Sequence, residues 1–299
     1  MDTKKVPAFC CVYGRSGLGK TTDAGYSFPK GLFLAAPGAL KPIPPLCGYA
    51  PSEMEVRTMD EATAAIAAAR DHGSYDSVIV DDFSFLAEQT FAAYERSYSG
   101  YKLFGQLRNA VLAFRNAARF AGLHVIVNCW ERSPKIRDSG DRIRGGPDLT
   151  GKLPEQLPAM CDLVLRADTD PQRKGWPGIY RVNGGVDYVG KDRDDGTPNP
   201  APMNLGEILR HNGYVVGRLA SLDWQEAVVE QIASSLTQSD PKDDIPTLEQ
   251  VYSHLLAEHD PRHVRWTVRD GWDRAQLRRA TQKRHATFFG PQAANPFGL

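Results

Sequence analysis

A glycine-rich segment near the start of the chain restricts the fold more than any other feature. The preceding run, Ala8–Tyr13, is rich in residues that favour strands, and Gly14–Thr21 reads Gly-Arg-Ser-Gly-Leu-Gly-Lys-Thr. This segment matches G-x-x-x-x-G-K-[ST], in which a strand leads through a turn into a helix. Glycines let such a turn direct its backbone N–H groups at a phosphate. The chain is therefore expected to begin as strand, phosphate-binding loop and helix.

Short β-rich runs continue to alternate with helical stretches as far as residue 217. Strands are predicted near 7–13, 31–35, 77–81, 123–129, 162–167, 179–183 and 186–190. Helices are predicted at 58–73, 84–97 and 103–121, the last with a buried face of Leu107, Val111, Phe114, Ala118 and Phe120. Because helices join the early strands, neighbours should be parallel. We predict an α/β fold, a mostly parallel sheet flanked by helices, over 1–217, and a small helical C-terminal appendage over 218–299.

Composition narrows the class of protein further. The 299 residues carry 36 Lys+Arg and 36 Asp+Glu, so any affinity for nucleic acid must come from a local basic surface. No apolar run approaches the roughly 20 residues that cross a bilayer, and no leader is evident, so we expect a cytoplasmic protein without membrane contact. Five cysteines without a C-x-x-C pair argue against both a disulfide framework and a zinc site.

The glycine-rich segment and one later strand together predict a site for ATP and Mg²⁺. Lys20 would place a cation on the β and γ phosphates, and Thr21 would offer its hydroxyl to Mg²⁺. The strand over 77–81 ends in Asp81, whose carboxylate would hold the same metal. The predicted nucleotide contacts are Gly14, Arg15, Ser16, Gly17, Leu18, Gly19, Lys20, Thr21 and Thr22.

Two further side chains are candidates for contact with the terminal phosphate or the attacking water. Asp82 either polarises that water or caps the helix that follows. Asn128 ends the strand over 123–129, where its amide either senses the γ-phosphate or closes the strand through its own turn hydrogen bond. Glu131 is a second candidate for the sensing role. The sequence leaves each pair of alternatives open.

The order of these parts resembles the RecA-type ATPase core, and most closely the phage-encoded RecA-core proteins of single-strand annealing and recombination. The features that carry the resemblance, over about residues 6–200, are the loop 14–21, Asp81, Asn128, the charged loop after it, and Lys191-Asp192-Arg193 behind the last predicted strand. The resemblance implies that Lys191 and Arg193 reach a neighbouring subunit's γ-phosphate within a ring or filament. The alternative is a solvated hairpin whose charges pair locally.

The chain departs from that family at one place. RecA-like cores carry a catalytic Glu at the end of the strand after the phosphate loop, whereas residues 31–37 read Gly-Leu-Phe-Leu-Ala-Ala-Pro. Either Asp82 takes over this role, or ATP serves as an assembly switch that is hydrolysed slowly.

The segment Glu131–Pro147 is predicted to be an irregular loop, at the place where RecA-like proteins contact DNA. Its candidate DNA-binding residues are Arg132, Lys135, Arg137, Arg142 and Arg144. Trp130 beside it offers a stacking surface or packs in the core. The tail 261–285 is also basic and contains Trp266 and Trp272, which suits either single-stranded nucleic acid or the core of the appendage.

These features together predict a Mg²⁺-dependent ATPase that assembles on single-stranded DNA during phage recombination, with Lys20, Asp82, Asn128, Lys191 and Arg193 as its catalytic residues. Two other hypotheses remain: a nucleotide-switched scaffold or DNA-binding protein with little turnover, and a P-loop kinase.

Overall fold

The computed structural model describes residues 6–171, 178–183, 185–216 and 225–238, together with residues 271, 275 and 279. Within the predicted appendage the structure describes helix α8 (Gln225–Gln238) and the three single positions. The basic tail with Trp266 and Trp272 lies outside the described residues. In the part of the chain that is described, every helix is too short or too polar to span a bilayer.

One nine-stranded sheet forms the centre of the fold. Its strands are β1 (Phe9–Tyr13), β2 (Gly31–Ala35), β3 (Ser52–Met54), β4 (Ser77–Asp81), β5 (His124–Cys129), β10 (Leu163–Asp168), β11 (Ile179–Arg181), β12 (Lys191–Asp192) and β13 (Ala201–Pro202). They are ordered β13-β11-β10-β1-β5-β4-β2-β3, with β12 also pairing with β10. All pairs from β10 to β3 are parallel, and β11, β12 and β13 join antiparallel. The predicted α/β class is confirmed.

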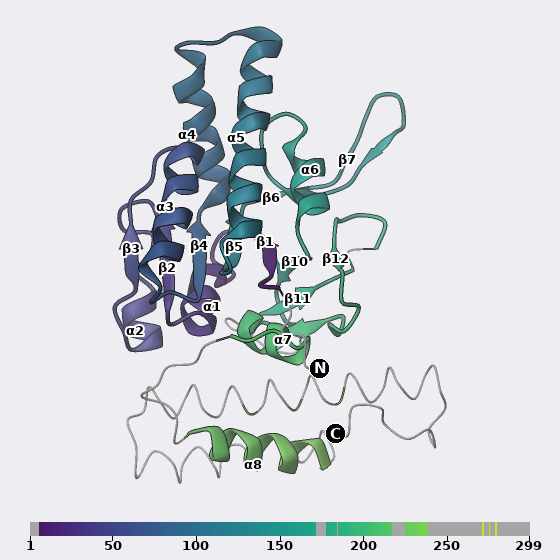
Figure 1. The fold of residues 1–299 in the computed structure, drawn as a ribbon. Helices are drawn as coiled ribbons and strands as arrows, with labels where there is room; N and C mark the ends of the chain where they lie inside the picture. The colour runs from purple at the N-terminus through teal and green to yellow at the C-terminus, as the bar shows by residue number, and fades with distance from the viewer. Residues whose placement is uncertain are drawn as a thin grey trace.

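Helices cover both faces of this sheet (Figure 1). They are α1 (Lys20–Ser27), α2 (Ile43–Cys47), α3 (Met59–His72), α4 (Phe83–Glu95), α5 (Gly100–Phe120), α6 (Leu153–Met160) and α7 (Leu205–His211). Alternate residues of β1 divide between two apolar clusters: Cys10 and Val12 belong with α1, α2 and α7, whereas Phe9, Cys11 and Tyr13 belong with α3 to α6. Strands buried on both faces explain the nearly continuous apolar runs of the sequence.

The helix predictions are confirmed with one correction. Thr58 caps α3 by accepting a hydrogen bond from the Glu61 N–H, and Gly73 ends that helix at φ +73°. In α5, Phe120 is 79% exposed, although it was assigned to the buried face. At 100° per residue Phe120 lies on the opposite side from Phe114 and Ala118, and Ala121 takes the buried position instead.

Two predictions for the later segments are wrong. Residues 186–190 do not form a strand, because a turn begins at Gly185 (φ +63°) and β12 starts only at Lys191. The supposedly irregular stretch after β5 is a β-hairpin arm, built from β6 (Glu131–Arg132) paired with β9 (Gly146–Pro147) and β7 (Lys135–Ile136) paired with β8 (Arg142–Ile143). This arm and the α4–α5 turn both project beyond the sheet (Figure 1).

The sheet order determines where a site can form. Strand β1 lies between β5 and β10, and β4 lies on the other side of β5. In this register Val12 is opposite Asn128, and Val127 is opposite Val80, one residue before Asp81. The phosphate loop, Asn128 and Asp81 therefore share the carboxyl edge of three adjacent parallel strands, where ligands of open α/β sheets bind.

Candidate functional site

The loop between β1 and α1 has the backbone conformation that its glycines allow. Gly17 and Gly19 take φ values of +81° and +92°, which side chains disfavour. At Gly14 a Cβ atom would lie 2.9 Å from the carbonyl oxygen of Ala167, so only glycine fits against β10. The N–H of Gly14 donates to the carbonyl of Cys129 at 3.4 Å, which ties the loop to the end of β5.

Lys20 opens α1 and lies within the loop that precedes it. Its Nζ donates to the carbonyl oxygens of Gly14 at 2.8 Å and Arg15 at 3.1 Å. Burial lowers the pKa of Lys20, while the nearby carboxylates of Asp81 and Asp82 raise it. A cation in this position is enclosed by its own loop and faces two acids.

Asp81 and Thr21 meet directly, as the predicted metal site requires. The Thr21 hydroxyl donates to Asp81 Oδ2 at 2.6 Å, and Asn128 Nδ2 donates to Asp81 Oδ1 at 3.1 Å. Asp81 is buried, which raises its pKa, although the two hydrogen bonds and the Lys20 charge lower it. Asn128 thus orients Asp81, and in the described part of the chain its amide makes no turn hydrogen bond that closes its own strand.

Asp82 performs one of its two predicted duties. Its Oδ1 accepts hydrogen bonds from the N–H groups of Ser84 at 2.7 Å and Phe85 at 3.2 Å, so Asp82 caps α4. Both bonds use Oδ1, so the cap does not involve Oδ2. Burial raises the pKa of Asp82 to about 6, with the negative charge of Asp81 adding to the shift. A carboxylate of this pKa suits general-base chemistry near neutral pH.

A pocket of about 420 Å³ lies over these groups. Its lining contains Ser16, Gly17, Gly19, Lys20, Thr21, Thr22, Asp81 and Asp82 from the predicted set. The side chain of Leu18 packs against the core. Ala39, Pro42 and Trp130 also line this pocket and are not among the predicted contacts. Trp130 is 37% exposed, and its backbone N–H donates to Ser84 Oγ at 3.0 Å. The position of Trp130 two residues after Asn128 is the signal that could have identified it.

The donors present fit Mg²⁺ bound together with a nucleotide. Thr21 and Asp81 supply hard oxygen atoms at the pocket, of the kind that Mg²⁺ prefers. Among the described residues no group of three or more His, Cys, Asp or Glu side chains is arranged to hold a metal. Phosphate oxygens and water would therefore complete the coordination.

Lys191 and Arg193 lie at the other end of the sheet. Strand β12 pairs with the beginning of β10, opposite to the carboxyl edge. Lys191 Nζ donates to the carbonyls of Pro158, Ala159 and Cys161 at the end of α6, and Arg193 pairs with Asp162 at 3.1 Å. A role across a subunit boundary would require both cations to leave these partners. Lys191 and Arg193 are therefore not part of the site at the carboxyl edge.

The five cations of the hairpin arm divide into two groups. Arg132, Arg142 and Arg144 contact the arm itself or the turn at 185–188: Arg132 donates to the Arg144 carbonyl, Arg142 pairs with Asp187, and Arg144 donates to the carbonyls of Gly185 and Tyr188. Lys135 and Arg137 are exposed towards the tip of the arm.

Comparison with known proteins places the chain in a family. Among solved structures it is similar to the RadB recombinase (19% identity, TM-score 0.36, 58% of this chain and 78% of that one). It is also similar to a KaiC-like protein from the archaeon Pyrococcus horikoshii OT3 (14%, TM-score 0.36, 58% and 76%). Scores this low support no argument, and no curated protein matches the sequence. A family model described as an AAA domain matches residues 7–194, more than half of the chain and all of the site, so the chain belongs to the AAA domain family.

Proposed function

We propose that the chain is a Mg²⁺-dependent ATPase with a RecA-like core that acts on single-stranded DNA in phage recombination or annealing. It would work in the host cytoplasm as a ring or filament of identical subunits. The observation that carries the ATPase part is the 2.6 Å contact of Thr21 with Asp81 beside a loop whose Gly17 and Gly19 take positive φ values. These two residues are sixty positions apart in sequence and meet at the point where a metal bound to nucleotide belongs.

The reaction would use this chain's own groups as follows. The loop N–H groups and Lys20 bind the β and γ phosphates and compensate their charge. Asp82 Oδ2 accepts a proton from a water as the water oxygen forms a bond to the γ-phosphorus. The bond from the γ-phosphorus to the β–γ bridging oxygen breaks, and ADP leaves with that oxygen while inorganic phosphate carries the water oxygen. Bound through Thr21 and Asp81, Mg²⁺ would supply positive charge for the phosphate oxygens.

Two basic surfaces support the DNA part of the proposal. The arm presents Lys135 and Arg137 near its tip. Helix α5 exposes Lys102 and Arg108 and has no acidic residue in its 21 positions, in a chain whose formal net charge is zero. Tyr101, which precedes Lys102, is 98% exposed. Cations for the phosphates with an aromatic ring for a base are the combination that single-stranded nucleic acid requires.

A nucleotide-switched binding protein with little turnover is the second candidate, and one observation favours it. Strand β2 ends at Ala35 and is followed by Ala36 and Pro37, so it brings no carboxylate to the site. In that case Asp82 serves only as a helix cap. Assembly would then respond to binding of ATP instead of its hydrolysis.

Phosphate release with and without single-stranded DNA tests the proposal. The full chain with Mg²⁺ and ATP is expected to release phosphate faster when a single-stranded oligonucleotide is added, and Lys20→Ala should abolish both rates. The matched control is Lys30→Ala, an exposed lysine three residues after the end of α1. ATP binding without release favours the switch, and phosphate transfer to an added acceptor favours a kinase. Absence of nucleotide binding would refute both the proposal and the switch.

A further inference from the structure

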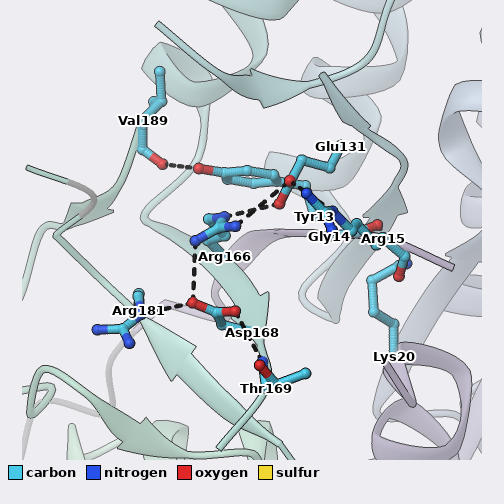
Figure 2. Close-up of polar contacts among 10 residues, drawn as sticks. All are labelled: Tyr13, Gly14, Arg15, Lys20, Glu131, Arg166, Asp168, Thr169, Arg181 and Val189. Carbon is cyan, nitrogen blue, oxygen red and sulfur yellow. Dashed lines mark hydrogen bonds and ion pairs between the residues drawn. The ribbon is translucent and has the colours of Figure 1, made fainter. Parts of the chain in front are cut away.

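The carboxylate of Glu131 is a buried charge beside the phosphate loop. Its side chain is 1% exposed and is held by Arg166, whose Nε lies 2.8 Å from Oε2. Arg15 of the phosphate loop reaches the other oxygen, with 3.7 Å between its Nε and Oε1, although the Arg15 side chain is 75% exposed. The Glu131 carboxylate is therefore shared between the partly buried guanidinium of Arg166 and the exposed side chain of Arg15 (Figure 2).

Arg166 has further contacts that fix it in place. It lies opposite Tyr13, the last residue before the loop, in the pairing of β10 with β1. Its Nη1 donates to Asp168 Oδ2 at 3.1 Å, and the same oxygen accepts a bond from Arg181. Figure 2 shows this chain of charges running from Arg15 through Glu131 and Arg166 to Asp168. Because Arg166 is anchored in the sheet, it holds Glu131 rather than the reverse.

The same guanidinium connects to the hairpin arm. Its carbon atom lies 3.8 Å from the centre of the Tyr188 ring. Tyr188 lies against Gly145, where a Cβ atom would come within 2.6 Å of the ring, and Val189 N donates to the Gly145 carbonyl at 3.0 Å. Glu131 itself is the first residue of β6, at the base of the arm. One end of the arm thus supplies Glu131, which contacts Arg15 and Arg166. The other end, at Gly145, reaches the same Arg166 through Tyr188.

We propose that Glu131 and Arg166 are positioning residues that couple the phosphate loop to the hairpin arm, with Arg15 as the moving part. The inference rests on nucleotide binding at the loop, as in the proposed function. A bound phosphate competes with Glu131 for the Arg15 guanidinium, because both are anions and Arg15 belongs to the loop that binds phosphate. Once Arg15 leaves, Arg166 is the one ion-pair partner that the described residues leave to the buried carboxylate, and the ladder between β6 and β9 loosens.

Hydrogen exchange in the full chain tests this coupling. The peptide that spans 131–147 is followed by mass spectrometry with and without Mg²⁺ and a non-hydrolysable ATP analogue, whose binding is measured by calorimetry in the same samples. In the wild type the analogue is expected to speed exchange in this peptide by at least about threefold. Glu131→Gln, which removes the shared charge but keeps the side-chain shape, should lose most of that response.

Two more variants make the result decisive. Tyr188→Leu removes the ring under Arg166 without exposing a buried charge, and it should lose the response even if Glu131→Gln folds poorly. Asp162→Asn is the matched control, since this buried carboxylate is also paired with arginines but lies at the opposite end of the sheet; its response should equal that of the wild type.

The outcomes separate the inference from the proposed function. If the wild type fails to bind the analogue, the proposed function fails. If it binds but exchange in 131–147 is unchanged or slower, or if Glu131→Gln and Tyr188→Leu respond as the wild type does, the coupling through Glu131 is overturned while nucleotide binding stands.

Discussion

The substitutions Asp82→Asn and Asp82→Ala distinguish the role of Asp82 as a helix cap from its proposed role as a general base. Asparagine caps helices about as well as aspartate, so Asp82→Asn keeps the acceptor for the N–H groups of Ser84 and Phe85 but cannot take a proton. Asp82→Ala removes both functions. The two variants therefore differ in stability if the cap matters, and share a loss of turnover if the base matters.

The structure gives the size of each effect. The cap satisfies two backbone donors at the start of the 13-residue α4, so Asp82→Ala should lower the free energy of unfolding by about 1 kcal/mol, and Asp82→Asn by much less. Loss of a general base should slow phosphate release by about 10²–10⁴-fold in both variants. This is a barrier increase of about 3–5 kcal/mol, well above the effect on stability.

The pH dependence adds an independent check on the same residue. Because the pKa of Asp82 is raised to about 6, its ionised form is lost as the pH falls through that value. Wild-type turnover should fall about tenfold for each pH unit below the pKa and level off above it. Phosphate release at saturating ATP and urea unfolding of each variant provide the data. Turnover of Asp82→Asn at the wild-type rate would refute the base assignment and leave the switch as the better account.

Three further predictions concern the metal site and the stability of the fold. Thr21→Ala removes the hydroxyl next to Asp81, so Mg²⁺ should strengthen nucleotide binding less than in the wild type; an equal effect of Mg²⁺ in a calorimetric titration would contradict the metal site. His124 is buried in its neutral form, and burial lowers its pKa. Below about pH 6.5 this histidine therefore binds a proton in the unfolded chain but not in the folded chain, so the free energy of unfolding should fall as the pH drops. Urea melts across this range should show that slope, and His124→Asn should flatten it. Arg119→Leu leaves the buried Asp162 with a weaker set of partners and should cost about 3 kcal/mol in urea unfolding, whereas a loss under about 1 kcal/mol would show that the pair is not needed.

Local patterns allowed the centre of the site to be predicted. The loop at Gly14–Thr21 and the acid at the end of β4 depend on strand order and on glycine conformation, both of which leave a direct mark in sequence. The meeting of Thr21 with Asp81 then follows from the parallel sheet. Asn128 was identified in the same way, because it lies at the carboxyl end of β5, the strand between β1 and β4.

The hairpin arm was missed although the sequence contains a signal for it. Lys135-Ile136-Arg137 and Arg142-Ile143-Arg144 flank a turn that contains Gly140 at φ +83°, a pattern typical of a hairpin. The high charge of this segment masks the alternation of polar and apolar residues that marks its two strands. Helix α7 was also missed, although Asn204 and Glu207 have capping spacing and the Asn204 side chain accepts the Glu207 N–H.

Other contacts had no local signal. Arg166 is a lone cation in an apolar strand, and only the fold shows that it meets Glu131 from a distant segment. Lys191 and Arg193 were assigned by resemblance, and their positions depended on which end of β10 receives β12. Long-range strand pairing of this kind is determined by packing of the whole domain, which a single sequence does not display.

Calorimetric titration of a non-hydrolysable ATP analogue with Mg²⁺ into the full chain tests the central claim most directly. The account predicts saturable binding at one site per chain, weakened at least about 100-fold by Lys20→Ala and made insensitive to Mg²⁺ by Asp81→Asn. Binding that is unchanged in both variants would contradict the claim that the loop and Asp81 form a single nucleotide and metal site.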